Sequence, residues 1–246
     1  LTVYEEDGFG LRPNISIRGT SPERSSKITI MEDGILAAPA PYSASSAYYF
    51  PSVARMSAVE VLKGSSQIQY GPYTTGGVIN FVSSEISDSL KIDLENSYGS
   101  FRSGKLLSRI SNSNETLGYL FEYLNFNSDG FKTIEGGGNT GFDIDEFLLK
   151  FKIDLFKKYN TNHTIEFKFQ NYNEISNETY LGLTETDYDS KPLYRYPSTQ
   201  KDKMIAYKNQ YVISYILDFS DRFKVTTSAY NNFFRRNWYK LDDIVF

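Results

Sequence analysis

The residues that most often carry metal or nucleophilic chemistry are scarce in this sequence. His163 is the only histidine among 246 residues, and there is no cysteine. One histidine without a thiolate does not make a metal site of the usual kind, and we expect His163, at the start of a strand-like segment, to be an interface residue. The run Glu135–Gly138 lacks the strand–loop–helix setting of a phosphate cradle and is typical of a loop tip. These residues predict neither a metal centre nor a nucleotide site.

The composition restricts the class of protein. Aromatic residues make up 16% of the chain, with 20 Tyr and 18 Phe against a single Trp238. Such residues favour strands and also collect at membrane interfaces. A mean hydropathy of -0.43 and the lack of a long apolar run exclude a membrane-spanning helix, but strands that cross a membrane alternate and pass this test. The net charge of -4 disfavours nucleic acid as a partner.

The first 86 residues indicate a small mixed domain with many loops. Six of the eight prolines fall here, between short apolar runs such as "AVEVL" at 58–62 and "VINFV" at 78–82. The stretch "KITIMEDGILA" predicts a hairpin, because Asp33-Gly34 suits a two-residue turn with positive φ at both positions. The three glycines of "GPYTTGGVINFVSS" (71–84) would permit tight turns and close backbone approach before the strand at 78–82.

After Ser87 the pattern changes to a period of two, which predicts long strands. Alternating apolar and polar residues occupy "DIDEFLLKFKID", "HTIEFKFQ" and "YKNQYVISYILDF". Each run is about the length that a tilted strand needs to cross a bilayer, roughly 9–11 residues. We count seven strands between residues 87 and 246, the last of them truncated.

The connections between these strands alternate in length. Tight turns are predicted at 112–115, 157–160 and 220–222, and long loops at 127–141 and from Ile175 to about Met204; the first connection on the loop side, near Gly99, is short. Short turns on one side and long loops on the other are typical of outer-membrane barrels, with the short side periplasmic. A soluble sandwich with aromatic strands is the alternative fold. Both ends look cut, since the chain starts at Leu1 without a signal peptide and stops just after a strand, so we expect it to be part of a longer protein.

The first half resembles the plug domain of TonB-dependent outer-membrane receptors. The resemblance rests on "IRG" (17–19), the "DG" hairpin (33–34), "VEVLKG" (59–64) and "YGPYTTGGVINFV" (70–82), in order over about 65 residues. Within the family the sequence is most similar to the ferric dicitrate receptor group, which shares an "APAPY" type of segment. The resemblance implies residues 1–86 as the C-terminal portion of an α+β plug domain and 87–246 as the first strands of a transmembrane antiparallel β-barrel, which has 22 strands in the family.

The resemblance also implies a function and partners. Such a receptor, in the outer membrane of a Gram-negative bacterium, imports a metal chelate such as ferric citrate or another ferric siderophore and makes or breaks no bond. It has no covalently bound cofactor, and its cargo is an Fe(III) chelate. Its partners are TonB with the ExbB/ExbD complex, outer-membrane lipid and the chelate. Haem, cobalamin or another metal complex remain alternatives as cargo. So do a signalling or adhesion receptor and a barrel enzyme, although the one histidine lies at the wrong end for an enzyme.

An anionic chelate would need cations and hydrogen-bond donors on the outward surfaces, and Arg suits carboxylates best. The apical segments that the resemblance implies are 20–27 and 38–49, and the third outer loop adds 191–201. The candidate ligand-binding residues are Arg24, Lys27, Tyr42, Tyr48, Tyr49, Arg195 and Tyr196, with Tyr194 and Lys201 beside them. Where the ferric dicitrate group has a glycine and a citrate-contacting glutamine after "APY", this sequence has Ser43 and Ala44, so that contact does not carry over.

Two charges are expected to be structural. The resemblance places Arg18 of "IRG" and Glu60 of "VEVLKG" in the plug body, where the family holds the plug against the barrel wall. A buried charge must be paired, so we expect an acidic partner for Arg18 on the strands, with Glu122 and Glu166 as candidates. A cluster of aromatic residues is expected in the outer aromatic girdle: Tyr230, Phe233, Phe234, Trp238 and Tyr239, with Arg235 and Arg236 facing headgroups or ligand.

Overall fold

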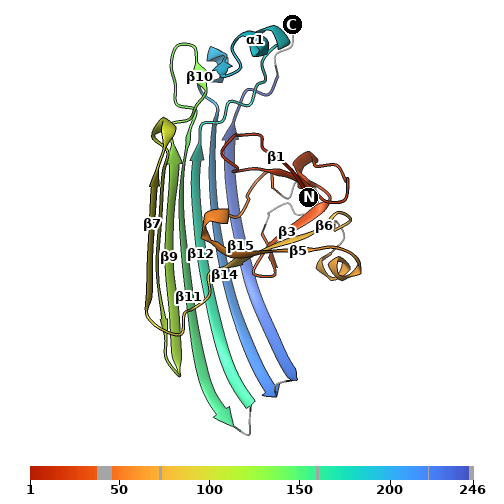
Figure 1. The fold of residues 1–246 in the computed structure, drawn as a ribbon, viewed down its shortest axis with the longest axis vertical. Helices are drawn as coiled ribbons and strands as arrows, with labels where there is room; N and C mark the ends of the chain where they lie inside the picture. Colours follow the sequence, from red (N-terminus) through yellow and green to blue (C-terminus); the bar gives the residue numbers. More distant parts are fainter. Residues whose placement is uncertain (38–45, 72–73, 159–160, 221, 244–246) are drawn as a thin grey trace. The chain divides into compact units, whose positions relative to one another are not determined.

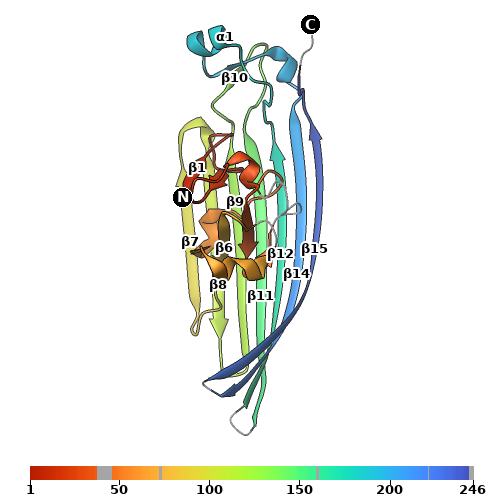
Figure 2. The same ribbon diagram turned by 90° about the vertical axis from the view of Figure 1, so that its right-hand side faces the viewer.

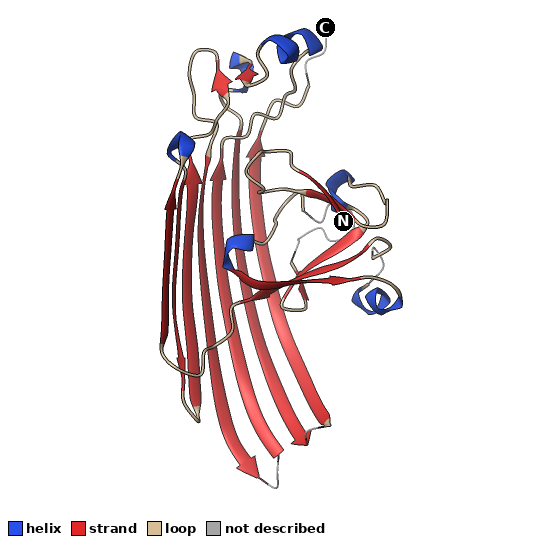
Figure 3. Cartoon of the chain, in the orientation of Figure 1, coloured by secondary structure: helices blue, strands red, loops and turns tan. Residues whose placement is uncertain are grey.

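The computed structural model describes residues 1–37, 46–71, 74–158, 161–220 and 222–243. The chain divides into two compact units, Leu1–Glu85 and Ile86–Phe246. Strands dominate both units, and the helices among the described residues are short (Figure 3). None of these helices is long and apolar enough to cross a membrane.

The first unit is organised by a four-stranded mixed sheet with the order β4-β3-β6-β5 (Figure 1). β3 and β6 run parallel, and β4 and β5 are antiparallel to their neighbours. A two-stranded sheet of β1 and β2 precedes it. The strands are β1 (Thr2–Tyr4), β2 (Asn14–Ser16), β3 (Ile28–Glu32), β4 (Ile35–Leu36), β5 (Met56–Leu62) and β6 (Gly77–Ser83), and short 3₁₀ helices cover Glu23–Ser25, Val53–Arg55 and Ser65–Tyr70.

The predicted hairpin at Asp33-Gly34 is confirmed. β3 and β4 pair antiparallel, and the two turn residues have φ of 50° and 77°, as a turn of this handedness requires. The Asp33 carboxylate accepts hydrogen bonds from the amide and hydroxyl of Ser83, at 2.8 and 2.5 Å, and the amide of Gly34 donates to Asn80. The turn is therefore tied to β6.

Two glycines allow β6 to lie between β3 and β5. A Cβ at Gly76 would stand 2.9 Å from the carbonyl oxygen of Lys27, and one at Gly77 would stand 2.9 Å from that of Leu62. Gly77 also has φ of 146°, which side chains rarely adopt. The glycine-rich stretch thus lets the chain enter a sheet too tight for a side chain, and the strand predicted at 78–82 is its third member.

The second unit holds a seven-stranded antiparallel sheet in which every strand pairs with its neighbours along the chain. Figures 1 and 2 show these strands side by side, in the order β7-β8-β9-β11-β12-β14-β15. The predicted seven strands are confirmed within the described residues. They are β7 (Lys91–Tyr98), β8 (Gly104–Ser113), β9 (Leu117–Ser128), β11 (Phe142–Lys158), β12 (Thr161–Ser176), β14 (Lys203–Ser220) and β15 (Phe223–Tyr239).

The last four strands are longer than predicted. They have 17, 16, 18 and 17 residues, against the roughly 9–11 that cross a bilayer. Apolar alternation in the sequence stops where Asn and Asp enter the pattern, so it marks only part of each strand. The backbone pairing continues through these polar residues, because ladder hydrogen bonds do not depend on side-chain polarity.

The two faces of this sheet differ in chemistry. Paired residues share a face, and one row across six strands is entirely apolar or aromatic: Ile92, Ile110, Phe121, Leu149, Phe169 and Tyr211. The opposite face carries buried polar and charged side chains: Glu122, Glu146, Lys168, Gln170, Glu174, Lys208 and Gln210. A sheet with an apolar belt on one face and polar side chains on the other has the pattern of a membrane barrel wall.

Candidate functional site

Two long connections of the second unit are joined to each other. β10 (Thr133–Ile134) lies between β9 and β11, β13 (Tyr194–Arg195) lies between β12 and β14, and the two pair in parallel. The hydroxyl of Tyr194 donates to Glu135 over 2.5 Å. The amide of Gln200 donates to the carbonyls of Glu135 and Gly137, at 3.2 and 3.0 Å. The glycine run predicted as a loop tip is therefore held by hydrogen bonds.

The longer connection also carries the helix α1 (Glu185–Ser190), whose first turn is held by side-chain hydrogen bonds. Thr184 is the N-cap residue and accepts the amide proton of Asp187 at 3.2 Å. The hydroxyls of Tyr196 and Thr184 donate to the Asp187 carboxylate, at 2.6 and 2.8 Å. These bonds to the ionised form hold the pKa of Asp187 below its usual value. The hydrogen bond that Tyr194 donates to Glu135 stabilises the protonated hydroxyl and raises the pKa of Tyr194 to about 12.

Arg195 secures the same loop. One guanidinium nitrogen donates to the carbonyls of Pro192 and Tyr194, at 2.9 and 2.5 Å. Burial of the guanidinium lowers its pKa, although an arginine stays charged at neutral pH. Lys201 is exposed.

In the first unit, two cations lie on an exposed segment. Arg24, at the centre of a 3₁₀ helix, has φ of 53°, and its amide donates to Asn14 at 2.8 Å. The carbonyl of Lys27 accepts the amide of Gly76 at 2.8 Å. Both side chains are exposed, and neither makes a hydrogen bond or ion pair with another described residue. Their backbones are fixed while their charged ends are available.

The first unit also contains a buried ion pair. Arg55 donates to both carboxylate oxygens of Glu32 at 2.9 Å, and the two side chains are 1% and 0% exposed. The hydroxyl of Tyr49 lies 3.5 Å from the same carboxylate. We did not predict this pair from the sequence. The signal was present, since Glu32 continues the alternation of Ile28 and Ile30 on a buried strand and must be paired there.

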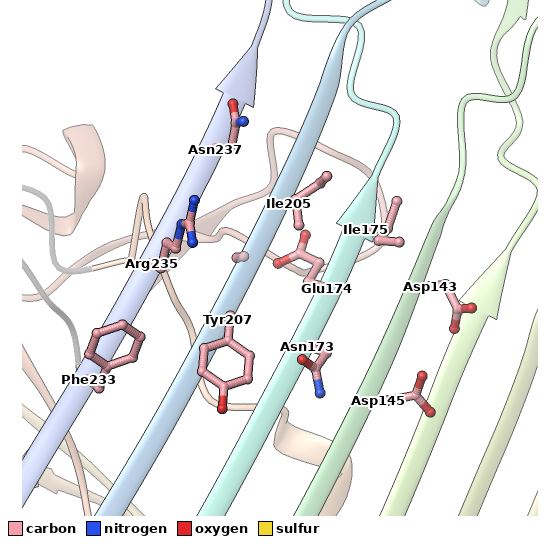
Figure 4. A pocket seen from close by; sticks show the side chains of 11 residues that line it. Asp143, Asp145, Asn173, Glu174, Ile175, Ile205, Tyr207, Phe233, Arg235 and Asn237 are labelled. Atoms are coloured by element: carbon pink, nitrogen blue, oxygen red, sulfur yellow. The ribbon is translucent and has the colours of Figure 1, made fainter.

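A groove of about 560 Å³ runs across four strands of the second unit. One row of paired residues, Asp145, Asn173, Tyr207 and Arg235, crosses it from β11 to β15. Figure 4 shows these side chains with Asp143, Phe233 and Asn237 around the same hollow. By register the row lies on the face that carries the apolar belt, four residues along β11 from Leu149.

The N-terminal part of the chain matches a known family. Residues 1–78 match the family model for the TonB-dependent Receptor Plug Domain. Residues 1–78 are a TonB-dependent receptor plug. The family consists of receptors, not enzymes.

Solved structures extend the likeness from the plug to the sheet. The chain is similar to the unliganded ferric citrate transporter FecA (23% identity, TM-score 0.76, 97% of this chain and 36% of that one). It is also similar to the ferric yersiniabactin uptake receptor FyuA from Yersinia pestis (17%, 0.71, 96% and 37%) and the ferric-catecholate import receptor Fiu from E. coli (13%, 0.69, 92% and 34%). The chain therefore has the plug-and-barrel fold and spans about a third of these receptors.

With the plug identified, the predicted ligand residues fall into three groups. Arg24 and Lys27 are exposed, and Tyr48 is half-buried. Tyr42 lies outside the described residues. For these residues ligand contact stays a prediction.

The prediction that Tyr49 contacts the ligand is wrong. Its side chain is 1% exposed and bonded to Glu32, so it belongs to the plug core. On the loops, Arg195 and the hydroxyl of Tyr196 are engaged in fixing the loop. Ligand contact by Arg195 and Tyr196 stays a prediction, and either residue would have to bind the ligand in addition to fixing the loop.

The role of the two plug charges against the barrel wall stays a prediction. Arg18 and Glu60 are both exposed. The Glu60 carboxylate accepts a hydrogen bond from Asn80 at 2.8 Å. Glu122, which we considered as a partner for Arg18, receives the Arg109 guanidinium at 2.7 Å, and Glu166 is exposed. Within the first unit, the buried and paired arginine is Arg55 and not Arg18 of the "IRG" motif.

The predicted aromatic girdle on β15 is only partly correct. Tyr239 and Phe233 lie on the face of the apolar belt, but Trp238 pairs with Met204 and shares the opposite face. There it packs edge-on against Tyr180 at 5.3 Å, with the ammonium of Lys240 4.6 Å from its ring. Trp238 and Tyr239 were predicted together because they are adjacent in the sequence. Successive residues of a strand point to opposite faces, so the two side chains lie on different faces of the sheet. His163 lies on β12, where its Nδ1 is 2.6 Å from the hydroxyl of Tyr215.

Proposed function

We propose that this chain is part of a receptor that imports a ferric chelate across the outer membrane of a Gram-negative bacterium. The observation that carries the proposal is the match of residues 1–78 to the plug domain, followed by an antiparallel sheet whose register separates an apolar face from a polar one. A plug is useful only inside a pore wall, and this sheet has the chemistry of such a wall.

The membrane placement follows from the sheet. The apolar belt faces lipid, and the face with buried Lys, Glu and Gln side chains lines the lumen. The joined connections 129–141 and 177–202 then stand at the outer surface, because they lie on the opposite side from the turn at Asn114–Thr116 between β8 and β9. This is the side from which a scarce ligand arrives.

The import step needs no catalytic group. The chelate binds on the outer side, and TonB, driven by the ExbB/ExbD complex, pulls on the plug to open a path. Within the plug, the Arg55–Glu32 pair connects the end of β3 to the segment before β5, and the tie between Asp33 and Ser83 connects the β3–β4 turn to β6. These contacts define the part of the plug that resists the pull.

The proposed cargo is an anionic ferric chelate. Arg24 and Lys27 offer positive charge without an internal partner among the described residues, and charge-assisted hydrogen bonds to carboxylates are the strong ones. The ferric citrate transporter is among the similar structures, which makes ferric citrate the first ligand to test. Ser43 and Ala44 remove one expected citrate contact, so a different ferric siderophore is the second.

The test is a titration of the full-length receptor in detergent with ferric citrate, a catecholate chelate, haem and cobalamin. Saturable binding of a ferric chelate that weakens on the order of tenfold in Arg24→Gln or Lys27→Gln supports the proposal. Glu23→Gln, which changes a neighbouring exposed charge of the opposite sign, is the matched control and is expected to leave binding intact or strengthen it. Binding of cobalamin or haem alone would overturn the ferric cargo, and absence of binding across the panel would overturn the import function.

A further inference from the structure

The connections on the loop side of the large sheet are joined to one another in the part of the chain that the structure describes. In chain order they are 99–103, 129–141, 177–202 and the segment 240–243 that follows β15. Because the strands alternate in direction, these first, second, third and fourth connections lie at one end of the sheet (Figures 1 and 2). We call them together the rim. Each connection of the rim is hydrogen-bonded to the next.

The first link joins the first connection to the start of the second. The amide of Asp129 donates to the carbonyl of Phe101 at 2.9 Å, and the guanidinium of Arg102 lies 3.4 Å from the Asp129 carboxylate. Phe101 and Arg102 have φ of 58° and 50°, a conformation that is costly for residues other than glycine. Their contacts with Asp129 offset the cost of this conformation.

The second link, between the second and third connections, is the most extensive. It contains the parallel pairing of β10 with β13 and the hydrogen bond from Tyr194 to Glu135. In addition, the amide of Asn177 donates to the carbonyl of Gly141 at 2.9 Å. The two connections are therefore joined both near their middle and where they meet the strands.

Asp202 makes the third link, between the third and fourth connections. Its side chain is 4% exposed, and its two carboxylate oxygens accept the amides of Tyr180 and Leu241, at 3.2 and 2.9 Å. The ammonium of Lys240 lies 3.4 Å from the centre of the Tyr180 ring and 4.6 Å from that of the Trp238 ring. One buried carboxylate thus joins segments that lie 22 residues before it and 39 residues after it.

The rim also has buried side chains, which an ordinary exposed loop lacks. They belong to the second and third connections and are Ile134, Thr140, Thr179, Thr199 and Asp202. Segments with few buried groups and exposed backbone hydrogen bonds open locally at little cost. The rim combines buried groups with a continuous series of links, so opening one connection removes support from the next.

We propose that Asp202 is a positioning residue that makes the rim one cooperative body, so that the outer binding surface is formed before the chelate arrives. The rim carries Arg195 and Tyr196, whose side chains are fixed by hydrogen bonds within the third connection. A surface that is already ordered binds more tightly, because binding does not pay for ordering it. The inference rests on the proposed function to the extent that it takes this surface to bind the chelate.

The test is hydrogen exchange of the full-length receptor with and without Asp202→Ala. In a cooperative rim this change is expected to speed exchange about tenfold at the amides of Asp129 and Thr133, in the second connection, as well as at its own partners. Amides of β11 and β12 are expected to exchange as before, which shows that the sheet is folded. Asp189→Ala removes an exposed acidic residue of the third connection. It is the matched control and is expected to leave every rim amide unchanged.

Tyr194→Phe tests the same coupling from the other direction. It weakens the second link and is expected to speed exchange at the amides of Tyr180 and Leu241, which Asp202 holds. Faster exchange confined to these two amides in Asp202→Ala would overturn the proposal, because Asp202 would then act only locally. Unchanged exchange throughout the rim of Asp202→Ala would overturn it as well.

Affinity for ferric citrate and for the catecholate chelate is measured on the same samples. For the chelate that binds, Asp202→Ala is expected to weaken affinity about tenfold. Asp202→Asn keeps one acceptor oxygen and is expected to restore part of this loss. Equal affinity of Asp202→Ala and the unaltered receptor would overturn the positioning role. Absence of binding by the unaltered receptor would overturn the import function, and the exchange rates alone would then decide whether the rim is one body.

Discussion

One guanidinium nitrogen of Arg55 donates to both carboxylate oxygens of Glu32 in the plug, with both N–O distances at 2.9 Å. Glu32 ends β3, and Arg55 directly precedes β5, so the pair connects the two strands that flank β6. Tyr49 adds a hydroxyl to the same carboxylate. One buried contact thus joins three separate segments of the plug.

Replacing Arg55 by Met is expected to destabilise the plug by about 3–5 kcal/mol, because the buried Glu32 carboxylate loses its ion pair with the Arg55 guanidinium. Hydrogen exchange of the β3 and β6 amides in the full-length receptor measures the effect. The double variant Glu32→Leu/Arg55→Met is expected to recover most of the loss, since it removes both charges together. Arg24→Met, at an exposed site, is the control, and similar exchange in Arg24→Met and Arg55→Met would contradict the assignment.

Gly76→Ala and Gly77→Ala are each expected to cost roughly 1–3 kcal/mol through overpacking. Each added methyl would stand 2.9 Å from a backbone carbonyl oxygen that cannot rotate away. Gly99→Ala is the matched control, since that glycine has φ of -144° and open space around its Cβ position. Hydrogen exchange of the β3 and β6 amides at increasing temperature compares the stability of the plug in the three variants. Equal stability of the three variants would show that the sheet yields at this point.

The loop contact between Tyr194 and Glu135 predicts a loss of loop stability at alkaline pH. The pKa of Tyr194 is raised to about 12 in the folded loop, whereas an unfolded tyrosine ionises near 10. The folded loop therefore keeps the proton longer, and its added stability is complete below about pH 10 and lost as the pH rises towards 12. A tyrosinate absorbance titration of the receptor minus that of Tyr194→Phe isolates this group. Ionisation of Tyr194 near pH 10 would contradict the contact.

Asp187 predicts the opposite pH dependence. Its pKa is lowered by the hydroxyls of Tyr196 and Thr184, so its contribution is present above the unfolded value near 3.9 and is lost as the pH falls through the lowered folded value. Asp187→Asn is expected to loosen the first turn of α1 and remove this acid transition. Asp189→Asn, on the same helix, is the control. The measurement is proteolysis of the 177–202 connection over a range of acidic pH.

Much of the architecture was predictable from local patterns. Alternation gave the strands, because each has one apolar face, and Asp33-Gly34 gave its turn because few other dipeptides adopt positive φ twice. Strand ends were harder to predict, since β11 and β12 are polar near the long loops and show no apolar alternation there. The family resemblance supplied the plug.

The site was less predictable, because side-chain roles depend on partners far away in the sequence. Tyr49 and Tyr48 are adjacent, yet one is in the core and the other half-buried. Tyr194 donates a hydrogen bond to Glu135, which lies 59 residues earlier in the chain. No local sequence pattern predicts such a contact. The groove arises only when residues from four strands come into register.

The strict neighbour-to-neighbour pairing of the large sheet constrains how such a wall can change in evolution. Loss of one strand would carry every later loop to the opposite end and reverse the direction of every later strand. Loss or gain of a hairpin keeps each remaining strand in its direction and each loop on its side. Such a wall is therefore expected to gain or lose strands two at a time in evolution, which agrees with the even strand numbers of bacterial outer-membrane barrels.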